Sequence, residues 1–317
     1  MTEQINQKSF VDFLHEVNTF PVDQRNSFVD HYLTTIQSFP FIEKESLVHF
    51  IFRGDAESIS IPCDANDWNP SEFYMKRIEG TNFWHFSHRF EPDARIDYKF
   101  LINGSYWILD PLNPRRVEGG YDDNSELRMP KYVSPPEIEY HPEIPHGTVT
   151  EMEFYSETLN NSRIISIYTP YNYHRSNEYF PLILFHDGKE FMTKGRAINI
   201  LDYLIARRRI MPLIAVFVPP LDRNAEYAGA RMNSFHTFII DELIPYIDQN
   251  FRTRRGTADR ATIGASSGGN ISLLLGLHYP ETFGNIAALS SNIVSAVSHG
   301  YENSPRLSIK FYIDIGT

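Results

Sequence analysis

The chain has 317 residues, of which 42% are apolar, and a formal net charge of −11. This length and apolar content suffice for a large core and suit two domains better than one. The acidic charge, with no basic run to offset it, argues against nucleic acid and anionic membrane surfaces as partners. A polar N-terminus without a secretory signal, no run of the ~20 apolar residues that span a bilayer, and a lone cysteine, Cys63, predict a cytoplasmic protein.

Two short amphipathic helices are predicted in an N-terminal segment, residues 1–40. Apolar residues lie three or four apart in residues 8–18 and again in residues 23–38, where Pro21 and Pro40 bracket the second run. This spacing gives each helix one apolar stripe. We expect both helices to pack against a neighbouring element.

From Leu47 onward the apolar period changes to two, which predicts a small β-sandwich over residues 41–130. The stretches at 64–68, 98–104 and 110–114 resemble the early-set, carbohydrate-binding-module-like domains that precede some hydrolases, and the resemblance implies an immunoglobulin-like fold. Such domains usually carry glycine where this chain has Cys63. The three tryptophans of this region could stack on sugar rings, although at least two are expected in the core: Trp68, Trp84 and Trp107.

A proline-rich stretch, residues 131–146, predicts an extended linker. Beyond it, apolar strands alternate with helices expected near residues 196–209, 234–250 and 267–279. This alternation predicts an α/β domain over residues 147–317, with a mainly parallel sheet covered on both faces. The sheet is expected to be incomplete at its C-terminal end.

The strongest motif is Gly264-Ala-Ser-Ser-Gly268, which follows an apolar strand and opens a helical run. A G-x-S-x-G nucleophile elbow requires this order, because small neighbours let the serine occupy a strained corner with its Oγ exposed. The spacing selects Ser266 over Ser267. The alternative is a glycine-rich turn with a capping serine.

A serine nucleophile also needs donors for the developing oxyanion. The Ser267 N–H group is one candidate, because it lies at the start of the helix after the elbow. A second donor is expected from the turn Asp187-Gly188-Lys189, which follows the predicted strand 182–186 and whose glycine lets backbone approach the reacting atoms.

Residues 145–317 resemble the esterase family that includes enterochelin (siderophore) esterases, feruloyl esterases and mycobacterial mycolyl-transferases. The resemblance rests on His186-Asp187-Gly188, Arg223 with Glu226-Tyr227, Phe235 and Phe238 with Glu242–Pro245, Phe251–Thr253, the turn at Ser266, and His278–Gly284. It implies an α/β-hydrolase with Ser266 as nucleophile and the Lys189 and Ser267 N–H groups as oxyanion hole. The order of a leading β-sandwich followed by this hydrolase most resembles the enterochelin-esterase-like branch.

The base and acid are harder to place. His186 precedes the serine, against the order serine, acid, histidine of this fold, and is expected to be structural. His278 is twelve residues along the helix from Ser266, about 18 Å away, and His299 is expected in a loop before the last strand. Asp314 is expected inside that strand, so we do not assign it as the acid. Acid and histidine are therefore expected beyond Thr317, in a chain truncated at its C-terminus.

Arg223, Glu226 and Tyr227 follow a strand and, with the His186–Gly188 turn, are candidates for binding substrate; an ion pair with a packed tyrosine is the alternative. The predicted activity is hydrolysis of a small carboxylic ester of siderophore, acyl-sugar or hydroxycinnamate type. Two alternatives stay open, an acyltransferase and a non-catalytic protein that binds a glycan or another ligand. No metal-ligand spacing stands out, so no cofactor is expected, and the oligomeric state is open.

Overall fold

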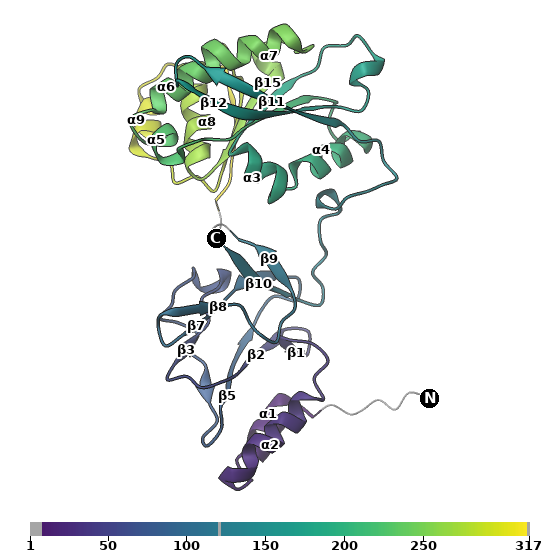
Figure 1. The fold of residues 1–317 in the computed structure, drawn as a ribbon, viewed down its shortest axis with the longest axis vertical. Coiled ribbons are helices and arrows are strands. Elements are labelled where there is room, and N and C mark those ends of the chain that lie inside the picture. Colours follow the sequence, from purple (N-terminus) through teal and green to yellow (C-terminus); the bar gives the residue numbers. More distant parts are fainter. Residues whose placement is uncertain (1–7, 120–121, 316–317) are drawn as a thin grey trace. The chain divides into compact units, whose positions relative to one another are not determined.

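The computed structural model describes residues 8–119 and 122–315 and divides into two compact units, Met1–Ser134 and Pro135–Thr317 (Figure 1). The start of the predicted N-terminal segment, residues 1–7, and the last two residues, 316–317, lie outside the described residues. Within the described ranges, no helix is both long enough and apolar enough to cross a membrane.

The first unit opens with two helices, α1 (Phe10–Val17) and α2 (Val22–Leu33), as the apolar stripes predict. Ser9 caps α1 by accepting the Asp12 N–H at 3.1 Å. The helices bury one aromatic face against the sheet, in a cluster of Phe10, Phe13, Val17, Val29, Tyr32, Ile36, Phe41, Ile51, Ile78 and Phe83. These two short helices therefore obtain their stability from packing rather than from their own length.

The second helix ends earlier than predicted, at Leu33 instead of residue 38. The Thr34 and Thr35 hydroxyls each donate to a carbonyl three residues back, at 2.7 Å. Such local hydrogen bonds compete with helix continuation, which explains the early end.

Short antiparallel strands follow, ten of them in the described part of this unit. They form three sheets, with the orders β1 (Phe41–Glu43), β2 (Leu47–Arg53), β5 (Phe83–Arg89), β4 (Lys76–Arg77); then β6 (Arg95–Tyr98), β10 (Asp123–Arg128), β9 (Arg116–Glu118); and β3 (Ile59–Ser60), β7 (Phe100–Ile102), β8 (Tyr106–Ile108). The strands β6 and β7 follow each other along the chain but belong to different sheets, separated at Lys99. The Lys99 N–H donates to the Pro62 carbonyl at 3.1 Å, and its ammonium group pairs with Asp122. Lys99 thus marks the point where the chain changes sheet.

The tryptophans of the first unit differ in exposure. Trp84 is 5% exposed and lies in the core, and the Trp68 indole N–H donates to Asp64 at 2.9 Å. Trp107 is 47% exposed and borders a cavity of about 410 Å³ with Lys99, Leu109, Asp122 and Asp123. The all-β character matches the prediction, whereas an immunoglobulin-like identity stays a prediction.

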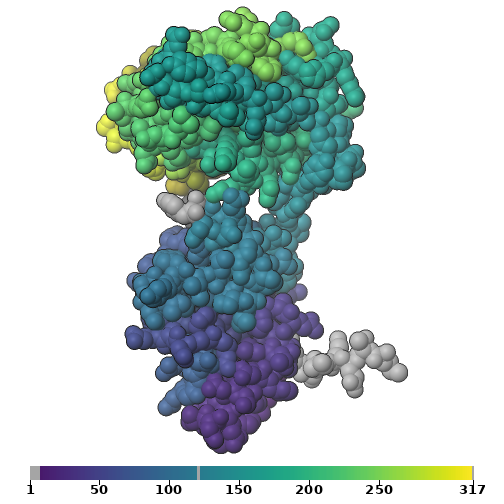
Figure 2. Space-filling model, viewed as in Figure 1, coloured from purple at the N-terminus to yellow at the C-terminus, as the bar shows by residue number. Residues whose placement is uncertain are grey.

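The second unit is built on one mixed sheet of seven strands. Their order is β11 (Thr148–Ser156), β12 (Asn161–Thr169), β14 (Ile214–Val218), β13 (Leu182–His186), β15 (Arg260–Ala265), β16 (Asn285–Leu289) and β17 (Lys310–Ile313). The five strands from β14 to β17 are parallel, and β11 and β12 are antiparallel additions at one edge. The exposed edge strand β11 and its neighbour β12 form part of the teal surface in Figure 2.

Helices cover both faces of this sheet. Their bounds are α3 (Gly188–Thr193), α4 (Ala197–Ala206), α5 (Arg223–Tyr227), α6 (Met232–Thr237), α7 (Ile244–Asn250), α8 (Ser267–His278) and α9 (Ser295–Glu302). Along β14, Val216 and Val218 pack with the cluster that includes α6, α7 and α8, whereas Ala215 and Phe217 pack with α4 on the other face (Figure 1). Burial of both faces explains why this strand is apolar throughout.

The helix predicted over residues 234–250 is interrupted in its middle. A π-helical turn, Phe238–Leu243, joins α6 to α7. Pro245 lies in the first turn of α7 and has no N–H to donate to the preceding turn. A widened turn accommodates this missing donor without ending the helix.

Candidate active site

The loops after the parallel strands meet at one edge of the sheet, the carboxyl edge, where open α/β sheets bind ligands. The Asp187 turn follows β13, α5 follows β14, and Ser266 follows β15. An added Cβ on Gly268, just past Ser266, would lie 2.9 Å from an Asp187 carboxylate oxygen. The structure therefore brings the Ser266 turn and the Asp187 turn into direct contact.

Ser266 occupies a strained corner between β15 and α8. Its φ of 53° and ψ of −122° are unusual for a residue with a side chain, and conformations of this kind cost about 1–3 kcal/mol. The Ser266 N–H donates to the Leu289 carbonyl at 2.8 Å, and its carbonyl accepts the Ser291 hydroxyl at 3.0 Å. These bonds to the end of β16 and to the loop after it hold the corner, while Ser266 itself is exposed.

The two glycines of the motif have a steric role. A Cβ on Gly264 would lie 2.3 Å from backbone atoms of Gly268, a separation that real Cβ atoms do not show. The turn can therefore close only when the residue two before the serine has no side chain.

The turn after β13 has the same character. Asp187 has a φ of 51°, in the left-handed region. A Cβ on Gly188 would lie 2.4 Å from the Phe217 backbone, so this position accepts glycine alone. Lys189 follows in the first turn of α3 and is exposed. Early N–H groups of a helix have no partner within it, which leaves Lys189 and Ser267 each with a backbone donor to offer.

Arg223 and Tyr227 of α5 hold Asp187 in place. The Arg223 guanidinium donates to both Asp187 carboxylate oxygens, at 2.8 and 2.9 Å, and also to the Ala265 carbonyl at 3.3 Å. The Asp187 N–H donates to the Tyr227 hydroxyl at 2.9 Å. Hydrogen bonding to the Asp187 carboxylate raises the pKa of Arg223, so its guanidinium stays charged.

Three of the predicted substrate-binding side chains are closed to solvent: His186, Glu226 and Tyr227. Burial, with the nearby His236, lowers the pKa of His186 to about 3, so the imidazole is neutral at neutral pH. Its Nε2 lies 3.0 Å from the Thr262 hydroxyl. Burial raises the pKa of Tyr227 well above its ordinary value. Among the predicted candidates on α5, Arg223 is the one that reaches solvent, with 41% of its side chain exposed.

Two predictions near the end of the chain are wrong in position. His299 lies in helix α9 instead of a loop, and it is exposed. Asp314 lies just past β17, which ends at Ile313, instead of inside the strand. Its carboxylate accepts the Ser290 N–H at 2.8 Å, so it braces the loop after β16.

Sequence reasoning also missed Arg163 of β12, which is 2% exposed and forms a two-pronged ion pair with Glu226 at 2.9 and 3.0 Å. The sequence does carry a signal, because Arg163 is a charged residue in a run otherwise typical of a buried strand. An arginine in such a run requires a buried acidic partner.

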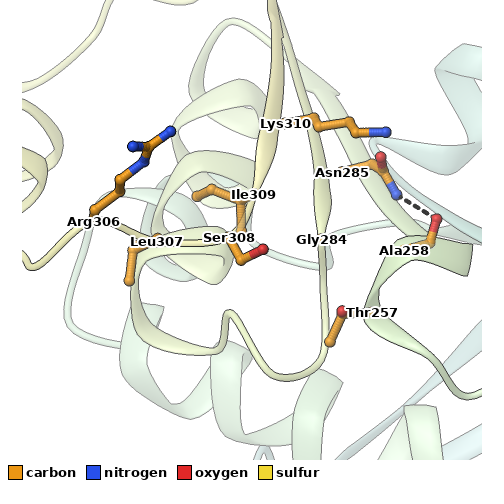
Figure 3. Close-up of a pocket in the computed structure, with 9 residues that line it drawn as sticks. All are labelled: Thr257, Ala258, Gly284, Asn285, Arg306, Leu307, Ser308, Ile309 and Lys310. Carbon is orange, nitrogen blue, oxygen red and sulfur yellow. Dashed lines mark hydrogen bonds between the residues drawn. The ribbon is translucent and has the colours of Figure 1, made fainter.

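A groove of about 420 Å³ lies at the opposite, amino edge of the sheet, around Asn285 and Lys310 at the starts of β16 and β17 (Figure 3). The Arg306 and Lys310 side chains extend in different directions there. The groove and Ser266 therefore lie at opposite ends of the parallel strands. Throughout residues 8–119 and 122–315, no group of three or more histidine, cysteine or acidic side chains is placed to hold a metal ion.

Comparison with known proteins gives a family match and several sequence relatives. Residues 156–306 match the model of a family described as "Putative esterase". The uncharacterized Bacillus subtilis protein YjcH is 32% identical over 178 residues, which cover 54% of this chain and 74% of that protein. An endo-1,4-beta-xylanase/feruloyl esterase of Xylanibacter ruminicola is 32% identical over 163 residues, which cover 48% of this chain and 22% of that protein. An iron(III) enterobactin esterase of Escherichia coli is 28% identical over 244 residues, which cover 69% of this chain and 60% of that protein.

The solved structures of two enterobactin esterases share the fold. The enzyme from Shigella flexneri gives a TM-score of 0.62 at 24% identity, covering 79% of this chain and 72% of that one. The enzyme from Salmonella typhimurium gives a TM-score of 0.64 at 22% identity, covering 78% of this chain and 73% of that one. The fold is thus of the α/β-hydrolase type. From the family model, the relatives and this fold, we conclude that the chain belongs to the esterase family that includes the enterobactin esterases.

Proposed function

We propose that this protein hydrolyses a small carboxylic ester through an acyl-serine intermediate at Ser266. The observation that carries the proposal is the backbone of Ser266, which is strained, exposed and closed by glycines on both sides. A capping serine in an ordinary turn needs no such conformation. Strain at an exposed serine between a strand and a helix is typical of a nucleophile that must reach its substrate.

The oxyanion hole of this proposal consists of the Lys189 and Ser267 N–H groups. Contact between Gly268 and Asp187 keeps the two turns adjacent. Donors held rigidly at a developing negative charge stabilise the transition state without reorganising during the reaction. Asp187 and Gly188 would shape this loop, and Arg223, which reaches solvent, would contact the substrate.

The buried candidates receive a different role. Because His186, Glu226 and Tyr227 are closed to solvent, we assign them to holding the loops instead of touching substrate. His186 is also a poor base, since burial disfavours its charged form. The general base that takes the Ser266 proton stays unassigned. Acyl transfer to an alcohol shares the acyl-enzyme and differs only in the acceptor, so it remains the alternative reaction.

For the chain as a whole, we propose residues 41–130 as an early-set β-sandwich after the helical segment 1–40, residues 131–146 as a linker and residues 147–317 as the hydrolase domain. The enterobactin-esterase structures match 79% of the chain, more than the second unit alone, which supports this division. Siderophore and hydroxycinnamate esters are the substrate classes that the names of the relatives suggest. A cytoplasmic location remains part of the proposal.

Replacement of Ser266 by alanine tests the mechanism. We expect Ser266→Ala to abolish both labelling by a fluorophosphonate and hydrolysis of an activated ester, because loss of the nucleophile removes the acyl-enzyme. Ser267→Ala is the matched control: it deletes the neighbouring hydroxyl but keeps the backbone N–H, and it should retain most of the activity.

Hydrolysis that survives Ser266→Ala would contradict the mechanism. If the unmodified protein also resists the fluorophosphonate while its tryptophan fluorescence responds to a glycan, the binding alternative would replace it. The exposed Trp107 beside its cavity is where such a response would arise.

A further inference from the structure

The ion pair between Arg163 and Glu226 is buried but close to the candidate active site. Both side chains are fully closed to solvent, and each guanidinium nitrogen of the fork meets one carboxylate oxygen. The guanidinium also lies 4.8 Å from the Phe238 ring centroid and donates to the Pro219 carbonyl at 3.2 Å. Such a pair fixes the direction of both side chains, because a planar fork matches a carboxylate in one orientation.

Glu226 is the inner anchor of α5. This helix has five residues, too few to be stable on its own. One Glu226 oxygen also accepts the Leu221 N–H at 3.2 Å, which ties down the chain just before the helix. The position of α5 therefore depends on what Glu226 binds.

The outer contacts of α5 reach both turns of the site. Arg223 donates two hydrogen bonds to the Asp187 carboxylate, and the Tyr227 hydroxyl accepts one from the Asp187 N–H. Arg223 donates a further one to the carbonyl of Ala265, the residue before Ser266. Asp187 needs such restraint, since a left-handed conformation persists only where the surroundings impose it. Lys189, whose N–H is a proposed oxyanion donor, lies two residues after Asp187.

We infer that Arg163 and Glu226 are positioning residues, which hold α5 so that Arg223 and Tyr227 keep the Asp187 turn and its Lys189 N–H aimed at the substrate carbonyl. This inference rests on the proposed function for its catalytic consequence. Its structural part, the restraint of residues 187–190 by a pair on the other side of α5, stands independently.

The test replaces both partners at once, Arg163→Met with Glu226→Met. Exchanging a buried ion pair for apolar side chains of similar size usually leaves the fold intact, whereas removing one partner leaves the other charge buried and unpaired. We expect kcat for an activated ester to fall about tenfold or more, because loss of an oxyanion donor costs 10²–10³. KM should change less than kcat, since the oxyanion contact belongs to the transition state.

A second readout does not depend on catalysis. Amide hydrogen exchange at residues 187–190 should become faster in the double variant, while the unfolding midpoint stays close to that of the unmodified protein. The matched control is Arg260→Met with Asp248→Asn, a largely buried pair with an N–O distance of 2.5 Å at the start of β15. It should change neither kcat nor this exchange.

Unchanged kcat together with unchanged exchange would overturn the inference. If Ser266→Ala leaves activity intact, the proposed function fails, and the exchange measurement still decides whether the pair restrains the turn. Should the double variant fail to fold, Arg163→Lys keeps the charge but loses the fork, and it should give a smaller fall in kcat with the same local increase in exchange. A folded Arg163→Lys protein without that increase would refute the restraint.

Discussion

The two edges of the second unit's sheet differ in how they are built. At the carboxyl edge, Ser266 and Asp187 adopt strained backbone conformations that glycines and charged hydrogen bonds enforce. At the amino edge, a groove of about 420 Å³ is lined by Arg306 and Lys310, both exposed. An open groove with exposed cations thus lies at one edge, and constrained turns lie at the other. Backbone constraint, rather than an open groove, is therefore what marks the candidate site.

The largest effect is expected from one methyl group at the carboxyl edge. Gly264→Ala places a Cβ 2.3 Å from the Gly268 backbone, so the turn must open and displace Ser266. A misplacement of about 1 Å can cost 10²-fold in rate. We expect esterase activity to fall by about that factor, with a loss of about 1–3 kcal/mol in the free energy of unfolding. Activity assays and urea unfolding measure the two effects.

The matched change at the amino edge is Gly256→Ala. Its Cβ would meet its nearest atom, in Asp259, at 3.6 Å, an ordinary contact, and its φ of −69° suits alanine. This variant should keep its activity and its stability. Equal losses in the two variants would mean that the edges do not differ in constraint.

A smaller effect, on the free energy of unfolding, is expected when the pH is lowered. The pKa of buried His186 is lowered to about 3 from 6.5, so between these values the unfolded chain binds a proton that the folded protein does not. The free energy of unfolding therefore decreases as pH falls below 6.5, by about 2 kcal/mol at pH 5 for this residue. His186→Gln keeps a polar group near Thr262 and should reduce the stability difference between pH 7 and pH 5 by about that amount.

Period and spacing alone predicted an α/β domain in which apolar strands alternate with helices, and they placed Ser266 between a strand and a helix. These features are local, because they depend on apolar alternation and on small residues at fixed offsets. The partners of Glu226 could not be predicted in this way, since Arg163 is more than sixty residues away and the contact exists only after the sheet forms. For the same reason, sequence could list Tyr227 and His186 near the site but could not show that both are buried.

The smallest effect is expected from removing the two exposed cations of the amino edge, Arg306→Ala with Lys310→Ala. The five residues of β16 separate the two edges by about 17 Å, at about 3.3 Å per residue. Screening in 0.15 M salt acts over about 8 Å, so these charges should contribute little to the field at the oxyanion site. We expect kcat/KM to change less than about twofold and the free energy of unfolding less than about 0.5 kcal/mol. A tenfold fall in kcat/KM that persists at higher salt would instead couple the groove to catalysis, and the groove would then be a functional site that backbone constraint had not marked.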